Sequence, residues 1–366
     1  MPESRPLVAP HIERLSPYVP GKPIEELERE LGIRGAIKLA SNENPFGPSP
    51  LALVAAAEAA RDGNRYPDGY RMRSDLARHH GVELSELILG NGSNELIDLL
   101  FRTFAEPGAH VVYPDPSFVC YRIGATSTNM SATEVQLRDA VHYDVDALLA
   151  AVTKETKLLF VANPNNPTGA YLGRADLSRL LREVPARVIV VLDEAYVEFA
   201  DAPDFASALE MRGLREHLVV LRTFSKAYGL AGFRMGYGVA SPQIVNYIDR
   251  VRAPFNVSAI ALAAARAALA DAVHLERGLS HNRTERARVM QALTAAGLTV
   301  APSQANFVLV DFKSDGRGIY DRLLRKGVIV RPMPPPIHTW LRITIGQTHE
   351  NDRMLAAVGE LSKDAP

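Results

Sequence analysis

The sequence is short of several features that mark particular classes of protein. Cys120 is the only cysteine among 366 residues, so no intrachain disulfide can form and a reducing cytoplasm is the expected location. The 41 basic and 42 acidic residues nearly cancel, which favours neither nucleic acid nor a membrane surface as a partner. The longest apolar runs, such as residues 188–192, are too short to cross a bilayer, and residues 1–10 lack the apolar core of a signal peptide. We therefore expect a soluble cytoplasmic enzyme, and no metal site is predicted.

Short β-rich runs alternate with helical patterns from about residue 85 to residue 240. The runs cover residues 87–90, 110–114, 158–164, 188–196, 217–225 and 235–240. Near-continuous apolar strands separated by helices predict an α/β fold, with a mostly parallel sheet flanked by helices. Ligands of such sheets bind at the carboxyl ends of the strands, where the polar motifs of this chain gather.

The pattern changes after about residue 257. Residues 259–279 predict one long helix, and residues 306–312, 328–332 and 341–346 predict strands of a second, smaller sheet. Three parts are therefore expected. Residues 1–40 would form an N-terminal arm and part of the small domain, residues 41–256 the large domain, and residues 257–366 a smaller α/β C-terminal domain.

The stretch GNGSNE, residues 90–95, follows a strand and opens a helix. Gly90 and Gly92 permit a tight backbone, while Ser93 or Asn94 can cap the helix. Exposed N–H groups and the helix dipole at such a turn can bind a phosphate. An ordinary strand-to-helix turn would use the same residues, so both interpretations stay open from this motif alone.

Two further motifs place polar groups beside a possible ring. NPNNPTG, residues 163–169, predicts a rigid loop that could aim the amide of Asn166 at a phenolate oxygen. Asp193 ends an apolar strand, where its carboxylate needs a partner such as a protonated heteroaromatic nitrogen. Tyr196 could donate to an oxygen of the same ring. Taken singly, Asp193 and Tyr196 would be read as a capping residue and a core residue.

The stretch TFSKAYGLAGFR, residues 223–234, holds one lysine among small and apolar residues. Apolar surroundings and cationic neighbours would lower the pKa of Lys226 and make it nucleophilic. Arg234 can bind phosphate oxygens with its forked guanidinium, and Thr223 and Ser225 can donate hydroxyls to them. A lone lysine is usually a surface charge, but the whole set matches the phosphate, pyridinium, 3-hydroxyl and aldehyde of pyridoxal 5′-phosphate.

The chain resembles the fold-type I pyridoxal-phosphate aminotransferases and, among them, the histidinol-phosphate aminotransferases. The resemblance spans nearly the whole chain and implies a large domain with a mostly parallel seven-stranded sheet flanked by helices. It rests on SPYVPGKP, KLASNENPFGPSP, RYPDGY, GNGSNELID, NPNNPTG, DEAYVEF, TFSKAYGLAGFRMGYG and VIVRP…LRITIG, which occur in the order typical of that family.

The resemblance implies roles for the residues around the cofactor. Lys226 would form the Schiff base and Asp193 would pair with the pyridinium, while Tyr196 would bind the 3-hydroxyl together with Asn166. Phe118 would stack on the ring, at a position where many members have tyrosine. The implied phosphate ligands are Ser93, Asn94, Thr223, Ser225 and Arg234.

The resemblance also implies a shared site and a substrate clamp. Tyr66 matches a tyrosine that reaches the cofactor phosphate of the neighbouring subunit, which implies an obligate homodimer. The residues implied around the substrate are Tyr18, Asn44, Arg331 and Arg342. Between the two arginines the family usually has a glycine-containing turn, whereas this chain has PMPPPIHTW, residues 332–340. Three consecutive prolines stiffen this loop, and Trp340 could line the side-chain pocket.

The resemblance implies transamination of L-histidinol phosphate with 2-oxoglutarate, giving imidazole acetol phosphate and glutamate in histidine biosynthesis. Two arginines with Tyr18 suit a dianionic phosphate better than a lone carboxylate. One alternative is an aromatic amino-acid aminotransferase, in which Arg342 binds the carboxylate. Another is a pyridoxal-phosphate decarboxylase of similar fold, such as threonine-phosphate decarboxylase. A catalytically idle cofactor-binding module is disfavoured, because the lysine, aspartate and arginine set is intact.

Overall fold

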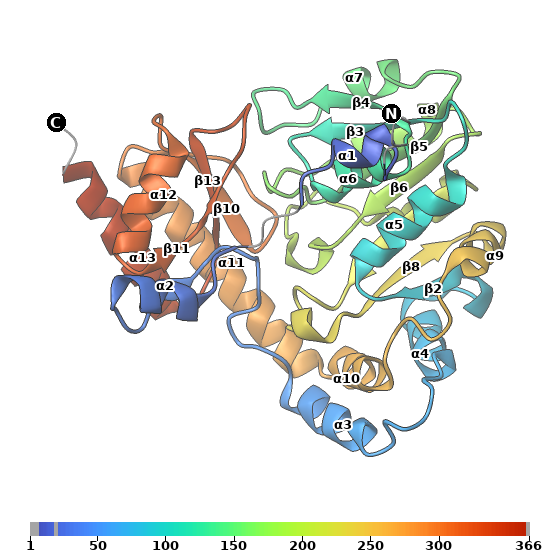
Figure 1. The fold of residues 1–366 in the computed structure, drawn as a ribbon, viewed down its shortest axis with the longest axis horizontal. Coiled ribbons are helices and arrows are strands. Elements are labelled where there is room, and N and C mark those ends of the chain that lie inside the picture. The colour runs from blue at the N-terminus through green and yellow to red at the C-terminus, as the bar shows by residue number, and fades with distance from the viewer. Residues whose placement is uncertain (1–6, 18–20, 364–366) are drawn as a thin grey trace, which may run out of the picture.

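The computed structural model describes residues 7–17 and 21–363, and its larger lobe is built on a seven-stranded sheet (Figure 1). The strands lie in the order β2 (Leu87–Gly90), β8 (Gly236–Ala240), β7 (Leu218–Thr223), β6 (Ile189–Asp193), β5 (Thr156–Ala162), β3 (His110–Asp115) and β4 (Ser131–Gln136). Strand β8 is antiparallel to both of its neighbours, and every other neighbouring pair is parallel. The predicted α/β fold with a mostly parallel sheet is confirmed.

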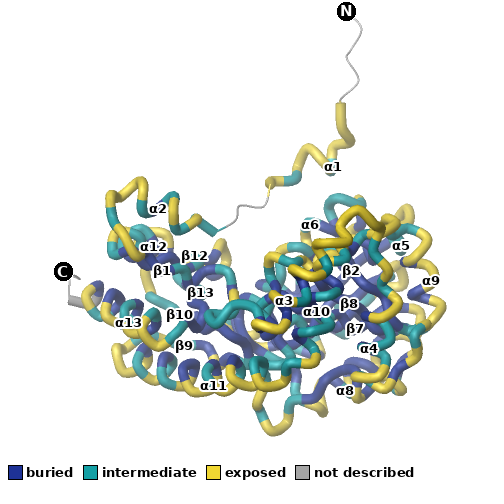
Figure 2. The backbone as a smooth tube through the Cα atoms, turned by 90° about the horizontal axis from the view of Figure 1, so that it is seen from below, coloured by how far each residue is buried: buried dark blue, intermediate teal, exposed yellow. Residues whose placement is uncertain are grey.

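The central strands are buried on both faces because their apolar side chains alternate between two cores. In β6 the side chains of Ile189 and Val191 join one apolar cluster, whereas those of Val190 and Leu192 join the other. Successive side chains of a strand point to opposite faces, so an unbroken apolar run requires helices on both sides. Figure 2 shows the resulting pattern, with buried strands inside and exposed turns on outer helices such as α9.

Helices cover both faces of the large sheet. One face carries α5 (Ser93–Phe104), α6 (Cys120–Ser127) and α9 (Pro242–Val251). The other face carries α3 (Pro50–Ala60), α4 (Tyr70–His80), α7 (Val145–Ala150), α8 (Arg174–Glu183) and α10 (Ala259–Ala270). Short 3₁₀ turns lie between them at η1 (Leu84–Glu86), η2 (Val197–Phe199), η3 (Ala208–Leu214) and η4 (Ala231–Phe233).

A smaller lobe has its own apolar cluster. Its antiparallel sheet has the order β12 (Arg331–Pro332), β13 (Trp340–Thr344), β10 (Phe307–Asp311) and β9 (Thr299–Val300). Beside it, β1 (Ile37–Lys38) pairs in parallel with β11 (Val328–Ile329). The remaining helices are α1 (Pro10–Glu13), α2 (Ile24–Leu31), α11 (Ala272–Ala295), α12 (Gly316–Arg325) and α13 (Thr348–Lys363). None of the helices in the described ranges is both long and apolar enough to span a membrane.

The prediction of one long helix over residues 259–279 is wrong, because the chain breaks at Asp271 between α10 and α11. The Asp271 carboxylate accepts hydrogen bonds from the Ser49 hydroxyl, 2.5 Å away, and from the His274 backbone N–H, 3.1 Å away. Asp271 therefore caps α11 instead of continuing α10, as a short polar side chain at a helix start often does.

The break at Asp271 separates two sets of contacts. Helix α10 packs against α3 and shares the apolar cluster of the large sheet. Helix α11 contributes Val289 and Leu293 to the cluster of the smaller lobe, and β1 joins that lobe through β11. This packing supports a proposal that the large domain extends to about residue 270, beyond the predicted boundary at 256.

Candidate active site

A cavity of about 220 Å³ lies at the carboxyl ends of the large-sheet strands and is closed on one side by the smaller lobe. Twelve of the residues singled out from the sequence line it. They are Ser93, Asn94, Phe118, Asn166, Asp193, Tyr196, Thr223, Ser225, Lys226, Arg234, Arg331 and Arg342. The parallel order of β5, β6 and β7 places their ends side by side, which is why motifs distant in sequence meet here.

Two other residues singled out from the sequence, Asn44 and Tyr66, do not line this cavity. Asn44 turns its amide to the Ala227 carbonyl, 2.8 Å away, and lines a separate surface hollow. Tyr66 is 82% exposed and stacks on Phe255 with ring centroids 4.4 Å apart. Tyr18 lies outside the described residues. The roles inferred for these three residues stay predictions.

One end of the cavity is shaped by glycines that let donors approach closely. Gly92 has φ of 77°, and a Cβ there would lie 2.4 Å from Nη2 of Arg234. A Cβ on Gly236 would lie 2.3 Å from the backbone nitrogen of Ser93, the first residue of α5. Any side chain at either glycine would therefore displace groups that can bind an anion at the helix N-terminus.

Hydroxyls and a guanidinium gather at the same end. The Thr223 hydroxyl donates to the Ser225 hydroxyl, 2.9 Å away, and Nη1 of Arg234 donates to the Ser225 hydroxyl at 3.4 Å. Arg234 has φ of 60°, a conformation that L-residues rarely adopt. The backbone therefore holds this guanidinium beside the hydroxyls, as a phosphate site requires.

Asp193 ends β6 inside the protein, where its two carboxylate oxygens have different surroundings. Oδ2 accepts a hydrogen bond from the hydroxyl of Tyr121, 2.9 Å away, whereas Oδ1 is buried and has no hydrogen-bond partner within the described part of the chain. Burial raises the pKa of Asp193 to about 6, and the Tyr121 hydroxyl works in the opposite direction. A carboxylate in this setting suits a cationic N–H partner.

Lys226 follows β7 and reaches the same cavity. Its Nζ donates to the carbonyl oxygen of Ser41 at 3.1 Å and lies 5.8 Å from the ring centroid of Tyr196. Burial lowers the pKa of Lys226 to about 8, and the nearby Arg342 guanidinium acts in the same direction. The lowered pKa raises the neutral share of the amine above that of an ordinary lysine, as a nucleophile or general base needs.

The Asn166 amide is oriented by an arginine from the smaller lobe. Nη1 of Arg342 donates to Oδ1 of Asn166 at 2.5 Å, and Nη2 donates to the Ala40 carbonyl at 2.6 Å. Because Oδ1 is the acceptor, the donating end of the Asn166 amide is fixed as well. The buried amide of Asn165 anchors the loop by donating to the Pro116 carbonyl, 3.0 Å away, a contact that agrees with the rigid loop expected from NPNNPTG.

Asn42 links the two lobes and was missed in the sequence. Its Nδ2 donates to the Tyr196 hydroxyl at 2.9 Å, and its Oδ1 accepts from the Thr344 hydroxyl at 3.1 Å. Its carbonyl accepts from the Asn306 amide at 3.1 Å. The residue is 1% exposed and has φ of 56°. Neither the burial nor the φ angle of Asn42 can be read from the sequence, where the residue stands only as part of the motif SNENP.

A buried ion pair behind the site was also missed. The Glu194 carboxylate, next to Asp193, accepts from Nη2 of Arg222 at 2.8 Å and from the Ser207 hydroxyl at 2.8 Å. It also accepts from the Ala208 backbone N–H at 2.6 Å. These contacts join the ends of β6 and β7 to η3, so the strand ends that carry Asp193 and Lys226 are held together.

Arg331 and Arg342 lie directly opposite each other on β12 and β13. Like charges at such positions repel, and an anion between them would relieve that repulsion. Both residues also line a neighbouring cavity of about 510 Å³, together with Met333 and Ile337 of the proline-rich loop. Trp340 contributes to neither of these two cavities and packs beside the small cluster that contains Met333 and Ile337.

The comparisons with known proteins agree with this arrangement. The profile of the family "Aminotransferase class I and II" matches residues 34–358. The chain belongs to the class I and II aminotransferases. This aminotransferase is 49% identical to histidinol-phosphate aminotransferase of Anaeromyxobacter sp. (strain Fw109-5), over 97% of the chain and 99% of the relative. It is 44% identical to histidinol-phosphate aminotransferase 2 of Pseudomonas aeruginosa, over 97% of each chain.

A solved structure matches this aminotransferase over its full length. It is the histidinol-phosphate aminotransferase of Sinorhizobium meliloti in complex with pyridoxal-5′-phosphate, with a TM-score of 0.89 and 32% sequence identity. The match covers 99% of both chains. The aminotransferase family inferred from the sequence motifs is therefore confirmed.

Proposed function

We propose that the enzyme is a pyridoxal-phosphate-dependent histidinol-phosphate aminotransferase. It would transfer the amino group of L-histidinol phosphate to 2-oxoglutarate, giving imidazole acetol phosphate and glutamate in histidine biosynthesis. The observation that carries the choice of substrate is the pairing of Arg331 with Arg342 across two strands, at a cavity that also contains Lys226. The names of relatives that are 44–49% identical support the same choice.

The residues of the cavity fit pyridoxal phosphate. The buried oxygen Oδ1 of Asp193 has no hydrogen-bond partner among the described residues and suits a protonated ring nitrogen. Gly92 leaves room for the Arg234 guanidinium beside the start of α5, and these donors suit the phosphate. Lys226 supplies the amine for the aldehyde. When bound, the cofactor accepts the electron pair left behind as the substrate Cα–H bond breaks.

The side chains of the protein then handle the protons. Nζ of Lys226, with its lowered pKa, would take the proton from Cα of the substrate and then donate it to the cofactor. The Asp193 carboxylate would keep a proton on the ring nitrogen, and Tyr196 with Asn166 would donate to the ring oxygen. Phe118 lines the same cavity and would limit access of water to the ring.

A second subunit would complete the site. Exposed apolar side chains lie on α3, at the start of α4, on α10 and on the loops beside them, and α10 packs against both α3 and α4. They are Leu51, Leu53, Val54, Tyr66, Tyr70, Phe255 and Ile260. Contiguous exposed apolar residues mark interaction surfaces, and we propose a second copy of this chain as the partner, with Tyr66 reaching its cofactor phosphate.

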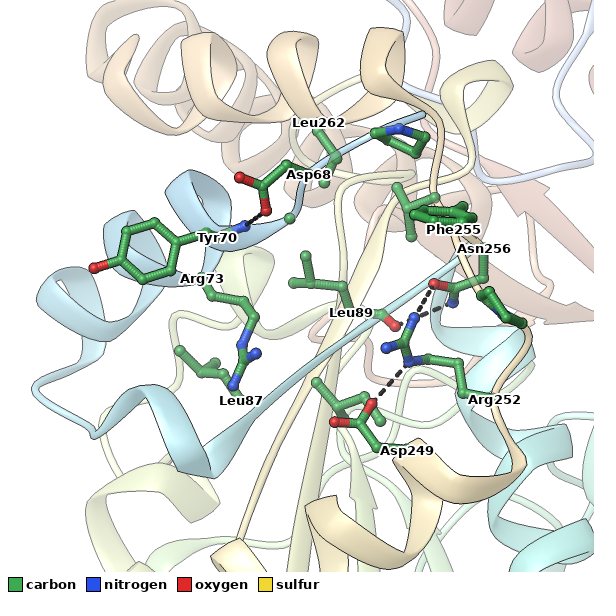
Figure 3. A pocket seen from close by; sticks show the side chains of 15 residues that line it. Asp68, Tyr70, Arg73, Leu87, Leu89, Asp249, Arg252, Phe255, Asn256 and Leu262 are labelled. Carbon is green, nitrogen blue, oxygen red and sulfur yellow. Dashed lines mark hydrogen bonds and ion pairs between the residues drawn. The ribbon is translucent and has the colours of Figure 1, made fainter. Parts of the chain in front are cut away.

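Figure 3 shows Phe255 at the edge of a pocket, next to Asn256 and near Arg252. Phe255 has φ of 57° and is 54% exposed. Arg252 donates to Asp249 and to Asn256 at 2.8 Å each, and the Asn256 amide donates to the Leu89 carbonyl at 3.2 Å. These contacts fix the backbone on both sides of Phe255, and so they also hold the ring on which Tyr66 stacks.

The reaction can be tested with purified enzyme, pyridoxal phosphate, L-histidinol phosphate and 2-oxoglutarate. Formation of glutamate and imidazole acetol phosphate in equal amounts supports the proposal. Release of CO₂ from threonine phosphate without an oxo product would support the decarboxylase alternative. For the dimer, mixing Lys226→Ala with Tyr66→Phe protomers should restore activity by forming one intact site, whereas a fully active monomer would contradict it. A cytoplasmic location stays a prediction from the composition.

A further inference from the structure

Tyr121 lies behind the cavity and does not line it, yet it contacts the side chain expected to govern the cofactor ring. It belongs to the first turn of α6 and is fully buried, with 0% exposure. Its hydroxyl donates to Oδ2 of Asp193 at 2.9 Å. The sequence analysis singled out Phe118, three residues earlier, but gave Tyr121 no role.

The ring of Tyr121 is held from two sides. It stacks on Phe160 of β5, with centroids 4.9 Å apart, and meets Phe118 edge to face at 5.9 Å. A buried aromatic side chain packed in this way cannot change its rotamer without disturbing its neighbours. The position of the hydroxyl is therefore fixed relative to β6.

The two oxygens of Asp193 are consequently not equivalent. Oδ2 is taken by the Tyr121 hydroxyl, and Oδ1 is buried without a hydrogen-bond partner in residues 7–17 and 21–363. A carboxylate with one oxygen held by a fixed donor has lost its rotation, so its other oxygen has a defined direction. The hydrogen bond also favours the ionised carboxylate, against the effect of burial.

We propose that Tyr121 is a positioning residue that orients Asp193 and keeps it ionised for the ring nitrogen of pyridoxal phosphate. The inference rests on the proposed cofactor and concerns only its nitrogen. Burial raises the pKa of Tyr121 well above its ordinary value, so the hydroxyl keeps its proton and remains a donor. Tyr121 touches neither substrate nor cofactor and acts through Asp193.

The test compares two ligands of the cofactor-free protein. One is pyridoxal phosphate, and the other is its analogue with carbon in place of the ring nitrogen. Hydrogen bonds to charged groups are strong enough that Tyr121→Phe should weaken pyridoxal phosphate binding by roughly tenfold to a hundredfold. Binding of the carbon analogue should change by less than about threefold, because it offers Asp193 no N–H group.

Tyr143→Phe is the matched control. Tyr143 is another buried tyrosine of the large domain, but its hydroxyl donates to the Ala162 carbonyl and not to Asp193. This variant should affect both ligands alike. In an Asp193→Asn background, adding Tyr121→Phe should cost little further affinity for pyridoxal phosphate. In the otherwise unchanged enzyme, Tyr121→Phe should lower kcat more than it raises KM for the amino donor.

Equal weakening of both ligands by Tyr121→Phe would overturn the inference and leave Tyr121 a packing residue. The inference would also be overturned if Tyr121→Phe weakened pyridoxal phosphate binding as much in the Asp193→Asn background as in the wild type. If Tyr121→Phe does not fold, Tyr121→His, which keeps a ring and an N–H donor, is measured with the same ligands. If Tyr121→His prefers pyridoxal phosphate over the carbon analogue by as much as the wild type does, the inference is supported. If Tyr121→His has lost this preference, the inference is contradicted. Wild-type protein that binds no pyridoxal phosphate would instead refute the proposed function.

Discussion

The large sheet and the smaller lobe reach the same cavity with different support. Asp193 and Thr223 are the last residues of buried strands, β6 and β7, in the middle of a seven-stranded sheet. Arg331 instead stands in the two-residue strand β12 at the edge of a four-stranded sheet, followed by a proline-rich loop with exposed residues. The difference suggests that the groups for the cofactor are fixed by the core, while those for the substrate can vary with the loop.

The largest effect is expected from removing Lys226, which belongs to the large-sheet side of the cavity. Lys226→Ala should lower kcat by at least roughly 10²–10⁴-fold, the share usual for a general base, because the amine that lines the cavity is lost. Bound pyridoxal phosphate should be retained in part by the groups around Arg234. Borohydride reduction and peptide mapping of the wild type should find the pyridoxyl group on Lys226. The surface variant Lys154→Ala should stay fully active, and labelling of a different lysine would refute the assignment.

Removing an arginine of the smaller lobe should lower kcat/KM less, and by amounts that depend on the substrate. Loss of a charge-assisted hydrogen bond costs about 1.5–3 kcal/mol, so Arg342→Ala should lower kcat/KM by roughly tenfold to a hundredfold. The loss should appear with histidinol phosphate, phenylalanine and 2-oxoglutarate, because each has an anionic group to bind.

Arg331→Ala should lower kcat/KM mainly for histidinol phosphate, since only a phosphate needs both guanidinium groups. Steady-state kinetics with the three substrates gives the comparison. The exposed Arg317→Ala on α12 serves as the control for loss of one positive charge. Equal losses for all three substrates in Arg331→Ala would remove the argument for a phosphate-selective pair.

Asn42 joins the two sides, and its loss tests whether they act together. Asn42→Gly removes the amide bound to Tyr196 but keeps the left-handed backbone, so kcat should fall by roughly threefold to tenfold, the value of a typical hydrogen bond. Asn42→Ala should also lower thermal stability, because φ of 56° strains an alanine. In a Tyr196→Phe background, Asn42→Gly should have little further effect on kcat. If the kcat losses of Asn42→Gly and Tyr196→Phe add in the double variant, the two residues act independently and this interpretation is wrong.

The last test changes the pH instead of a residue and concerns Lys226 on the large-sheet side. Burial lowers the pKa of Lys226 from 10.5 to about 8, so protonation of the amine falls as pH rises through about 8. The neutral amine reacts with the aldehyde, and the rate of cofactor uptake by the cofactor-free enzyme should rise about tenfold per pH unit below that value and then level off. Stopped-flow absorbance measures this rate. A rise that continues to pH 10 would show an ordinary lysine.

The sequence predicted the large sheet well because its strands are apolar on both faces and end in distinctive motifs. It did not reveal β4 as a run, because the strand lies at the sheet edge and reads SATEVQ, with mostly polar or small residues. The break at Asp271 also escaped prediction, since it depends on Ser49, more than 200 positions away in the chain. Such long-range contacts leave no periodic signal.

In the candidate site, too, local motifs could be predicted from the sequence and long-range contacts could not. Residues in compact motifs, such as Lys226 and Asp193, were found from the sequence, and the structure brings them into one cavity. Tyr121 and Asn42 were missed because their importance comes from partners 72 and 154 positions away. Trp340 was expected at the side-chain pocket, but the proline-rich loop places Met333 and Ile337 at the neighbouring cavity instead. The role inferred for Trp340 remains a prediction.

The most direct test of the whole account is the ranking of amino donors by the wild-type enzyme. kcat/KM is measured for L-histidinol phosphate, L-phenylalanine and L-tyrosine, each with 2-oxoglutarate as acceptor and with saturating pyridoxal phosphate. The account predicts the highest value for histidinol phosphate, by roughly tenfold or more, because only this donor engages both Arg331 and Arg342 with one dianionic group. A higher value for phenylalanine or tyrosine would contradict it and make the enzyme an aromatic amino-acid aminotransferase.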